Sequence, residues 1–108
     1  MVSYPRRDEV WLVTLDPRGS EIRKTRPCLV VSPDEMNGSL QTVLVAPMTS
    51  TLRGYRMRVT LVFRKKTGQV ALDQTRAVDR RRLVRKLGAV SSSTAREVSR
   101  TLVEMFVR

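Results

Sequence analysis

Short apolar runs separated by turn residues fill most of this chain, and only its C-terminal segment has the spacing of a long amphipathic helix. The apolar runs lie at 10–15, 28–31, 42–46 and 87–90, and residues 55–63 alternate between apolar and polar side chains. Such patterns are typical of strands, and the intervening Gly, Pro, Asn and Asp residues are typical of turns. The chain is therefore predicted to be mainly β, a small twisted barrel with one helix packed on it.

The finer organisation follows from local signals. Turns are predicted at residues 16–19, at Asn37-Gly38 and at residues 65–68, and a further strand is predicted to run from 70 through 78. Thr94 and Glu97 have the spacing of a capping box, which predicts a helix beginning there. Its buried stripe is expected to consist of Ala95, Val98, Leu102, Met105 and Phe106.

At 108 residues the chain has the size of one domain, 1–108, and its net charge of +11 predicts a polyanionic partner. Of its 21 cations 17 are arginine, which binds phosphate through two parallel hydrogen bonds. A merely solvated basic surface is the alternative. Neither a signal peptide nor a membrane-spanning segment is evident, so we expect a soluble, cytoplasmic protein in which Cys28 is a reduced core residue.

The residue types exclude several chemistries. The chain has no histidine and one cysteine, which excludes an ordinary zinc site and removes the commonest acid–base residue at neutral pH. Its ten carboxylates are scattered, so a magnesium site is not expected either, and its five glycines form no nucleotide-binding loop. We expect neither a metal nor a cofactor.

Arg26 is the strongest candidate for a functional residue. It ends a polar loop, residues 19–26, and Pro27 restrains it to an extended conformation just before an apolar strand. A guanidinium held in this way is suited to phosphate. Phosphoryl transfer depends largely on positioning and electrostatics, so Arg, Lys, Thr and Glu side chains could cleave RNA without metal, with the substrate's 2′-hydroxyl as nucleophile.

Five segments, taken in their order and spacing, resemble the MazF/PemK family of toxin endoribonucleases. They are Glu9–Val13, Asp16–Glu21, Lys24–Pro27, Val45–Ser50 and Leu72–Gln74, and the likeness covers nearly the whole chain. One position departs from the pattern, because the family often carries glycine directly before the acid of the first segment and this chain has Asp8. That substitution bears on the local turn and not on the site.

The resemblance implies an SH3-like barrel of the MazF/PemK/CcdB kind, assembled as a homodimer and inhibited by a cognate acidic antitoxin. It implies metal-free, sequence-specific cleavage of single-stranded RNA that leaves a 2′,3′-cyclic phosphate and a 5′-hydroxyl. The family's catalytic positions fall on Arg26, Thr49 and Glu21. Contacts to RNA are expected from Lys24, Thr25, Ser50, Arg56, Asp73 and Gln74.

Each of these residues also has a purely structural interpretation. Arg26 could pair with Glu21 or Asp16, Thr49 could cap a strand end, and Glu21 could orient Arg26 instead of activating the 2′-hydroxyl. Asp73 and Gln74 could satisfy backbone groups, although glutamine can also read base edges. Trp11 is expected in the core, and the clusters 64–66 and 80–82 are expected to be solvated and to attract RNA.

Two other functions are compatible with the charge and the small β fold. One is a nucleic-acid-binding barrel without catalytic activity, which gives no reason for the set Glu21, Arg26 and Thr49. The other is a toxin on the same fold that poisons a topoisomerase. Cleavage of RNA, binding without cleavage, and inhibition of supercoiling distinguish the three.

Overall fold

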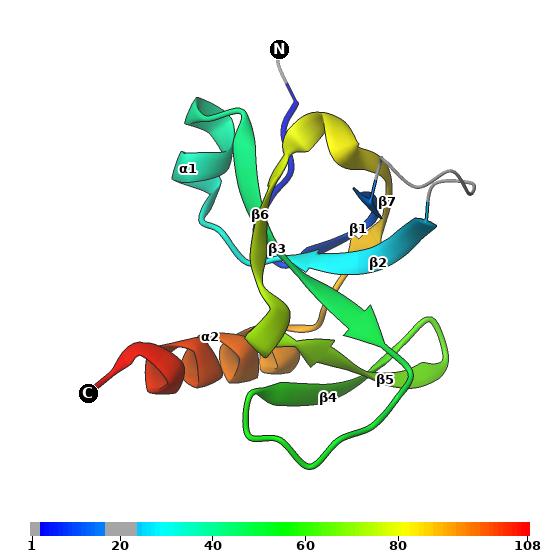
Figure 1. Cartoon of the computed structure of the whole chain (residues 1–108), viewed down its shortest axis with the longest axis vertical. Coiled ribbons are helices and arrows are strands. Elements are labelled where there is room, and N and C mark those ends of the chain that lie inside the picture. The colour runs from blue at the N-terminus through cyan, green and yellow to red at the C-terminus, as the bar shows by residue number, and fades with distance from the viewer. Residues whose placement is uncertain (1–2, 17–23) are drawn as a thin grey trace.

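A computed structural model of the chain describes residues 3–16 and 24–108. Within them the elements follow in the order β1 (Glu9–Asp16), β2 (Lys24–Val30), α1 (Asp34–Ser39), β3 (Thr42–Thr49), β4 (Arg58–Phe63), β5 (Lys66–Ala71), the 3-10 turn η1 (Leu72–Gln74), β6 (Arg76–Asp79), the 3-10 turn η2 (Arg80–Arg82), β7 (Leu83–Ala89) and α2 (Ser92–Phe106). The prediction of a mainly β chain with a C-terminal helix is confirmed (Figure 1).

The strands form one antiparallel sheet in the order β4-β5-β3-β2-β1-β7, and β6 pairs with β3 off this path. The two ends of the sheet approach each other, because the Arg64 guanidinium after β4 donates to the Leu87 carbonyl oxygen of β7. A Cβ at Gly88 would lie 3.2 Å from the Phe63 ring, so the two strands meet closely there. The sheet is thereby curled into the small barrel that the sequence predicts.

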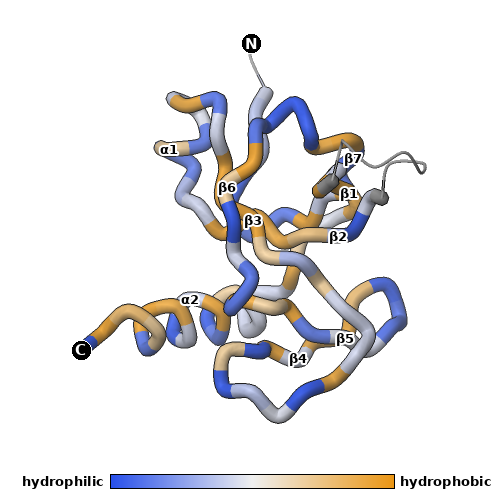
Figure 2. Tube along the Cα trace, in the orientation of Figure 1, coloured by the Kyte–Doolittle hydropathy of each residue, from blue (hydrophilic) through white to orange (hydrophobic). Residues whose placement is uncertain are grey.

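Two apolar clusters form the core. One joins β1, β2 and β3 to β4, β5 and α2 through residues such as Leu29, Leu61 and Val98. The other lies on the opposite face of β1–β3 and contains Val13, Cys28, Val45 and Val78. Figure 2 shows hydrophobic stretches along β1, β2 and β3 that hydrophilic residues interrupt, whereas η2 and the β4–β5 turn are continuous hydrophilic segments.

Several core predictions are confirmed, whereas the predicted burial of Met105 and Phe106 is wrong, since both are exposed. Burial raises the pKa of the Cys28 thiol to about 12, consistent with a core residue. Trp11 packs partly buried against the second cluster, with its Nε1 donating to Glu9 at 2.9 Å. Val98 is buried as predicted, but Phe106 is 77% exposed because α2 extends beyond the sheet that covers its first turns (Figure 1).

Three local predictions need correction. Asn37-Gly38 is not a hairpin turn but part of α1, where the buried Asn37 amide donates to the Ser32 carbonyl oxygen at 3.0 Å. Residues 70–78 are not one strand, since η1 separates β5 from β6. The N-cap of α2 is Ser91, whose hydroxyl accepts from the Thr94 backbone N–H, so the helix begins three residues before the predicted Thr94 cap.

The turn expected at residues 65–68 is instead a two-residue connection, Arg64 and Lys65, between β4 and β5. The turn expected at residues 16–19 lies mostly outside the described residues, as do residues 20–23 of the polar loop. No helix in the described ranges is long and apolar enough to cross a membrane.

Asp8 occupies a left-handed conformation, with φ of 77°. Its N–H donates to Val30 and its carbonyl oxygen accepts from Val90, at 2.9 and 3.0 Å, so both neighbouring strands hold this geometry. Left-handed backbone favours glycine, which explains why the family pattern has glycine at this position. The aspartate is tolerated because short polar side chains visit this region more readily than others.

We expect Asp8→Gly to raise the free energy of unfolding by about 0.5 to 1 kcal/mol, because glycine adopts this φ without steric strain. Urea unfolding measures the change. Asp8→Ala is the matched control, since it removes the carboxylate and keeps the strain. A loss of stability in the glycine variant would show that the Asp8 carboxylate makes a stabilising contact that outweighs the strain.

Candidate functional site

Arg26 and Thr49 lie on adjacent antiparallel strands. Cys28 of β2 faces Pro47 of β3, so moving two residues outward along each strand leads to Arg26 and Thr49 on one side of the sheet. Both residues lie beyond the buried part of the second core cluster, and Arg26 is exposed. The fold therefore places a guanidinium and a hydroxyl together at the edge of a rigid sheet.

Two adjoining clefts open at this edge. The larger cleft has a volume of about 660 Å³ and is lined by Thr25, Arg26, Pro27, Met48, Thr49, Ser50, Thr51, Leu61, Phe63, Arg64, Lys66, Thr67, Gly68 and Leu87. The smaller cleft, about 210 Å³, is lined by Arg26, Pro47, Thr49, Thr51, Arg53, Arg58, Ala71 and Gln74. Arg26, Thr49 and Thr51 belong to both, so they form the partition between the clefts.

The hydroxyl of Thr49 is held in a defined position. Its Oγ1 accepts from the Thr51 backbone N–H at 3.1 Å, which is the local turn that a threonine at a strand end favours. A hydroxyl that accepts through one lone pair still has its own hydrogen to donate. Thr49 therefore combines the predicted capping role with a donor available to an anion in either cleft.

The Thr49 backbone is also closely packed. Thr49 pairs with Gln69 of β5, and a Cβ at the neighbouring Gly68 would lie 2.8 Å from the Thr49 carbonyl oxygen. Any side chain at Gly68 would displace this segment. The glycine is thus a strand residue required by a close backbone approach, and not the turn glycine that the sequence predicts.

Gln69 fixes the loop that follows β3. Its buried amide accepts from the Arg53 N–H at 2.9 Å, and donates to the Arg53 carbonyl oxygen at 3.0 Å and to the Thr60 hydroxyl at 3.1 Å. Such a fully satisfied buried amide restrains the backbone to one position. It holds the backbone of Arg53, a residue that lines the smaller cleft as Arg26 does.

η1 carries Asp73 and Gln74, of which only Gln74 lines a cleft; Asp73 bonds to Arg58, a residue of the smaller cleft. The Thr75 hydroxyl donates to the Leu72 carbonyl oxygen at 2.7 Å and closes this turn, and Gln74 lines the smaller cleft. The Asp73 carboxylate accepts two hydrogen bonds from Arg58 of β4, Nε to Oδ1 at 2.7 Å and Nη2 to Oδ2 at 3.1 Å. The Arg58 side chain is only 8% exposed, and its guanidinium carbon lies 5.1 Å from the centre of the Tyr55 ring.

The hydrogen bonds from Arg58 hold the pKa of Asp73 below its ordinary value of 3.8, against the opposing effect of burial. The same pairing raises the pKa of Arg58. At neutral pH the carboxylate is therefore ionised and its two oxygens are engaged. Asp73 is a fixed structural acceptor at the edge of the smaller cleft, with Arg58 as its anchor.

We expect Asp73→Asn to reduce the acid sensitivity of the fold. A lowered folded-state pKa means that the carboxylate contributes stability above about pH 4, the ordinary pKa, and that this contribution is lost as the pH falls through the lowered value. The difference in unfolding free energy between wild type and variant should therefore shrink between pH 5 and about pH 2, measured by urea unfolding. Glu35→Gln, on the exposed side of α1, is the control. A constant difference would contradict the assignment.

The fold brings only some of the predicted site residues together in the two clefts. Arg26 and Thr49 lie in both clefts, Thr25 and Ser50 in the larger and Gln74 in the smaller. Arg56 instead lines a separate depression with Met57 and the α2 residues Thr101, Glu104 and Met105. Glu21 and the side chains of Asp16 and Lys24 lie outside the described part of the chain, so the predicted pairing of Arg26 with a loop carboxylate stays a prediction.

Sequence reasoning missed two arginines, Arg53 and Arg58. The sequence analysis assigned neither of them a role in the site. Their place in the smaller cleft depends on the strand register that sets Arg58 opposite Ala71 and on the long-range hydrogen bonds of Gln69 to Arg53. A local sequence pattern predicts neither the register nor these bonds. Among the described residues, no group of three or more His, Cys, Asp or Glu side chains is arranged to hold a metal.

Comparison with known proteins identifies relatives along nearly the whole chain. The family model of PemK-like, MazF-like toxins of type II toxin–antitoxin systems matches residues 6–106. The endoribonuclease MazF9 of Mycobacterium tuberculosis is 32% identical over 108 residues, covering 90% of this chain and 92% of that protein. The endoribonuclease PemK of Escherichia coli is 38% identical over 79 residues, covering 68% of this chain and 59% of that protein.

Solved structures give the same result. The crystal structure of MazF from Deinococcus radiodurans has 31% sequence identity and a TM-score of 0.76, and the match covers 96% of this chain and 97% of that one. A mycobacterial endoribonuclease in complex with its cognate antitoxin has 25% identity and a TM-score of 0.79, covering 93% and 92%. The arrangement of strands and helix described above is therefore similar to that of MazF.

Proposed function

This chain belongs to the family of PemK-like, MazF-like toxins of type II toxin–antitoxin systems, and from that premise we propose that it is a sequence-specific endoribonuclease acting on single-stranded RNA without a metal. The observation that carries the proposal is the meeting of Arg26 and Thr49 in the partition between two clefts. The relatives MazF9 and PemK are endoribonucleases, which supports the same reaction class here.

In the proposed reaction the 2′-oxygen of the nucleotide before the cut attacks phosphorus, and the bond from phosphorus to the 5′-oxygen of the next nucleotide breaks. The 2′-hydroxyl gives up its proton to a base and the leaving 5′-oxygen takes one, so the products are a 2′,3′-cyclic phosphate and a 5′-hydroxyl. Negative charge grows on the phosphoryl oxygens during attack, and fixed donors aimed at these oxygens lower the barrier.

We assign charge stabilisation to Arg26 and a hydrogen bond to a non-bridging oxygen to Thr49. An arginine stays protonated at neutral pH, which favours electrostatic stabilisation over proton transfer for Arg26. Glu21 is proposed as the base for the 2′-hydroxyl or as the residue that orients Arg26. Thr25 and Ser50 in the larger cleft and Gln74 in the smaller are proposed to contact the RNA, with Lys24, Arg56 and Asp73 as further candidates.

The proposal includes the assembly and control of the enzyme. We propose a homodimer, with residues 1–108 forming one toxin domain in each subunit; exposed Val103, Phe106 and Val107 near the C-terminus provide apolar surface for contact with protein. We propose inhibition by a cognate antitoxin, as in the antitoxin complex of the mycobacterial relative. An acidic, partly disordered antitoxin fits a net charge of +11, and messenger RNA in the cytoplasm is the proposed target.

The test is incubation of the purified protein with a long single-stranded RNA in excess chelator. We expect discrete fragments that end in a cyclic phosphate, and no cut where the nucleotide before the site is 2′-deoxy, because that nucleotide lacks the nucleophile. RNA that stays intact while bound would contradict the nuclease and favour a binding protein. Cleavage only when Mg²⁺ is restored would contradict the metal-free mechanism.

A further inference from the structure

The turn between β4 and β5 is built from residues that do not suit its geometry. Arg64 and Lys65 both have left-handed backbone, with φ of 52° and 67°, between the paired residues Phe63 and Lys66. Two-residue hairpin turns of this kind strongly prefer Asn-Gly, which adopts such angles with little strain. Two long basic side chains at strained positions point to a role other than stability. We call Arg64–Lys66 the basic lip.

The basic lip belongs to the larger cleft. Arg64, which follows β4, and Lys66 of β5 line this cleft together with Arg26 of β2 and Thr49 of β3, and Lys65 lies between the two lining residues. In Figure 1 the β4–β5 turn, the end of β3 and the start of β2 lie on the same side of the molecule. The cleft therefore has cations on two separate walls, one from β2 and one from the lip.

The lip is held in place before any ligand arrives. The Arg64 guanidinium donates to the Leu87 carbonyl oxygen of β7, and its central carbon lies 6.0 Å from the centre of the Phe63 ring. Lys65 and Lys66 are exposed, and no carboxylate of the described residues forms a salt bridge with either. Fixing a cation beforehand reduces the entropy lost when an anion binds.

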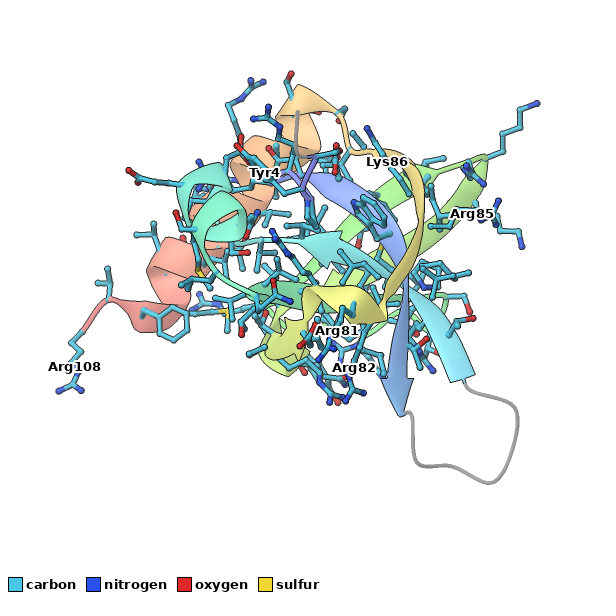
Figure 3. The ribbon with its side chains drawn as sticks, turned by 90° about the horizontal axis from the view of Figure 1, so that it is seen from above. Tyr4, Arg81, Arg82, Arg85, Lys86 and Arg108 are labelled. Carbon is cyan, nitrogen blue, oxygen red and sulfur yellow. The ribbon has the colours of Figure 1, made fainter. Side chains whose placement is uncertain are left out.

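Other basic residues are not gathered at this cleft. In Figure 3, Arg108 lies at one edge of the molecule and Arg85 lies toward the opposite edge. Arg81 and Arg82 lie between them, on η2. Arg81 is moreover paired with Asp79 at 3.1 Å. The net charge is thus spread over the surface, and the lip is distinguished by its place on the wall of the cleft.

We propose that the basic lip binds a backbone phosphate of single-stranded RNA next to the phosphate held by Arg26, and so sets the path of the strand through the larger cleft. The choice of RNA as the ligand rests on the proposed function. RNA is favoured over an acidic protein because the lip and Arg26 line one continuous cleft. The contact is to the backbone, so it strengthens binding of every sequence equally.

The first test variant keeps residues suited to the turn. Arg64→Asn/Lys65→Gly supplies the preferred residues at both left-handed positions but also removes the Arg64 hydrogen bond to the Leu87 carbonyl oxygen, so binding is compared at a temperature at which circular dichroism shows wild type and variant fully folded. Its Kd for RNA made uncleavable by a 2′-deoxy nucleotide at the mapped cut should rise about tenfold at low salt. The slope of log Kd against log salt should become shallower by about 0.7 for each RNA phosphate that the variant no longer neutralises.

Two further variants complete the design. Lys66→Gln leaves the turn intact and should weaken binding in the same direction by a smaller factor. Arg96→Gln/Arg108→Gln removes two exposed cations outside both clefts and should leave the salt slope closer to that of wild type than the lip variant does. If unmodified RNA proves not to be cleaved, the same titrations are made with it directly, so the lip is tested even where the proposed nuclease fails.

Unchanged Kd and salt slope in both lip variants would overturn the proposal. It would equally be overturned if the variants bound RNA normally but escaped inhibition by an acidic antitoxin, since the lip would then be a surface for protein.

Discussion

Arg26→Ala is expected to lower kcat for RNA cleavage by at least about 10³-fold, because a fixed cation that stabilises developing charge on a phosphoryl group has effects of this size. Arg26 is exposed and forms no part of either core cluster, so the thermal midpoint should stay close to that of wild type. Cleavage is measured under saturating RNA in chelator. The change should appear in kcat more than in KM, because the interaction strengthens in the transition state.

Two variants make this result specific. Arg26→Lys keeps the charge and loses the planar pair of donors, so it should recover only part of the activity. Arg96→Ala removes an exposed arginine of α2 and should cleave at the wild-type rate. If Arg26→Ala cleaved RNA at the wild-type rate, the protein would still be a nuclease, but Arg26 would not be a catalytic residue. Its role would then be the structural pairing with a loop carboxylate.

Gly68→Ala is expected to damage both stability and catalysis. The new Cβ would lie 2.8 Å from the Thr49 carbonyl oxygen, a backbone atom that cannot rotate away. Relief requires β3 and β5 to separate locally, and overpacking of this kind costs about 1 to 3 kcal/mol. Because the displaced residue carries the hydroxyl in the partition of the clefts, the loss of kcat should exceed what the fraction of unfolded protein explains.

Gly54→Ala is the matched control, since no atom lies within 4 Å of a Cβ built at that glycine. Urea unfolding and single-turnover cleavage, made on both variants at a temperature where both are folded, separate the two effects. If Gly68→Ala were as stable and active as Gly54→Ala, the close approach would have no role in placing Thr49.

The parts of the fold that depend on the local pattern of apolar and polar residues could be predicted from the sequence. Alternation placed Val59 and Leu61 on the buried side of β4, and the apolar stripe placed Val98 under α2. Asn37 was misread because its turn propensity is overridden by a buried hydrogen bond to Ser32. The end of α2 was misread because periodicity shows which face is apolar and not whether a sheet covers it.

The site divides in the same way. Arg26 and Thr49 were predicted as site residues from the proline and strand signals around them and from the family resemblance, and they line both clefts. Arg58 was not, because its burial depends on Asp73, fifteen residues later, and on the η1 turn that presents that carboxylate. Asp8 is a third situation. Its departure from the family pattern is visible in the sequence, but its left-handed backbone conformation is seen only in the structure.

The shared partition between the two clefts has a consequence for inhibition. Under the proposed function, an occupant of either cleft that contacts Arg26 or Thr49 would deny those groups to RNA, so occupying one cleft at this partition would be enough to inhibit cleavage. The larger cleft has an apolar part formed by Met48, Leu61, Phe63 and Leu87, which an uncharged molecule can fill by desolvation alone. Under the same proposal, a competitive inhibitor that fills this apolar part and also reaches Arg26 or Thr49 need not imitate a phosphate, and a natural antagonist need cover only one of the two openings.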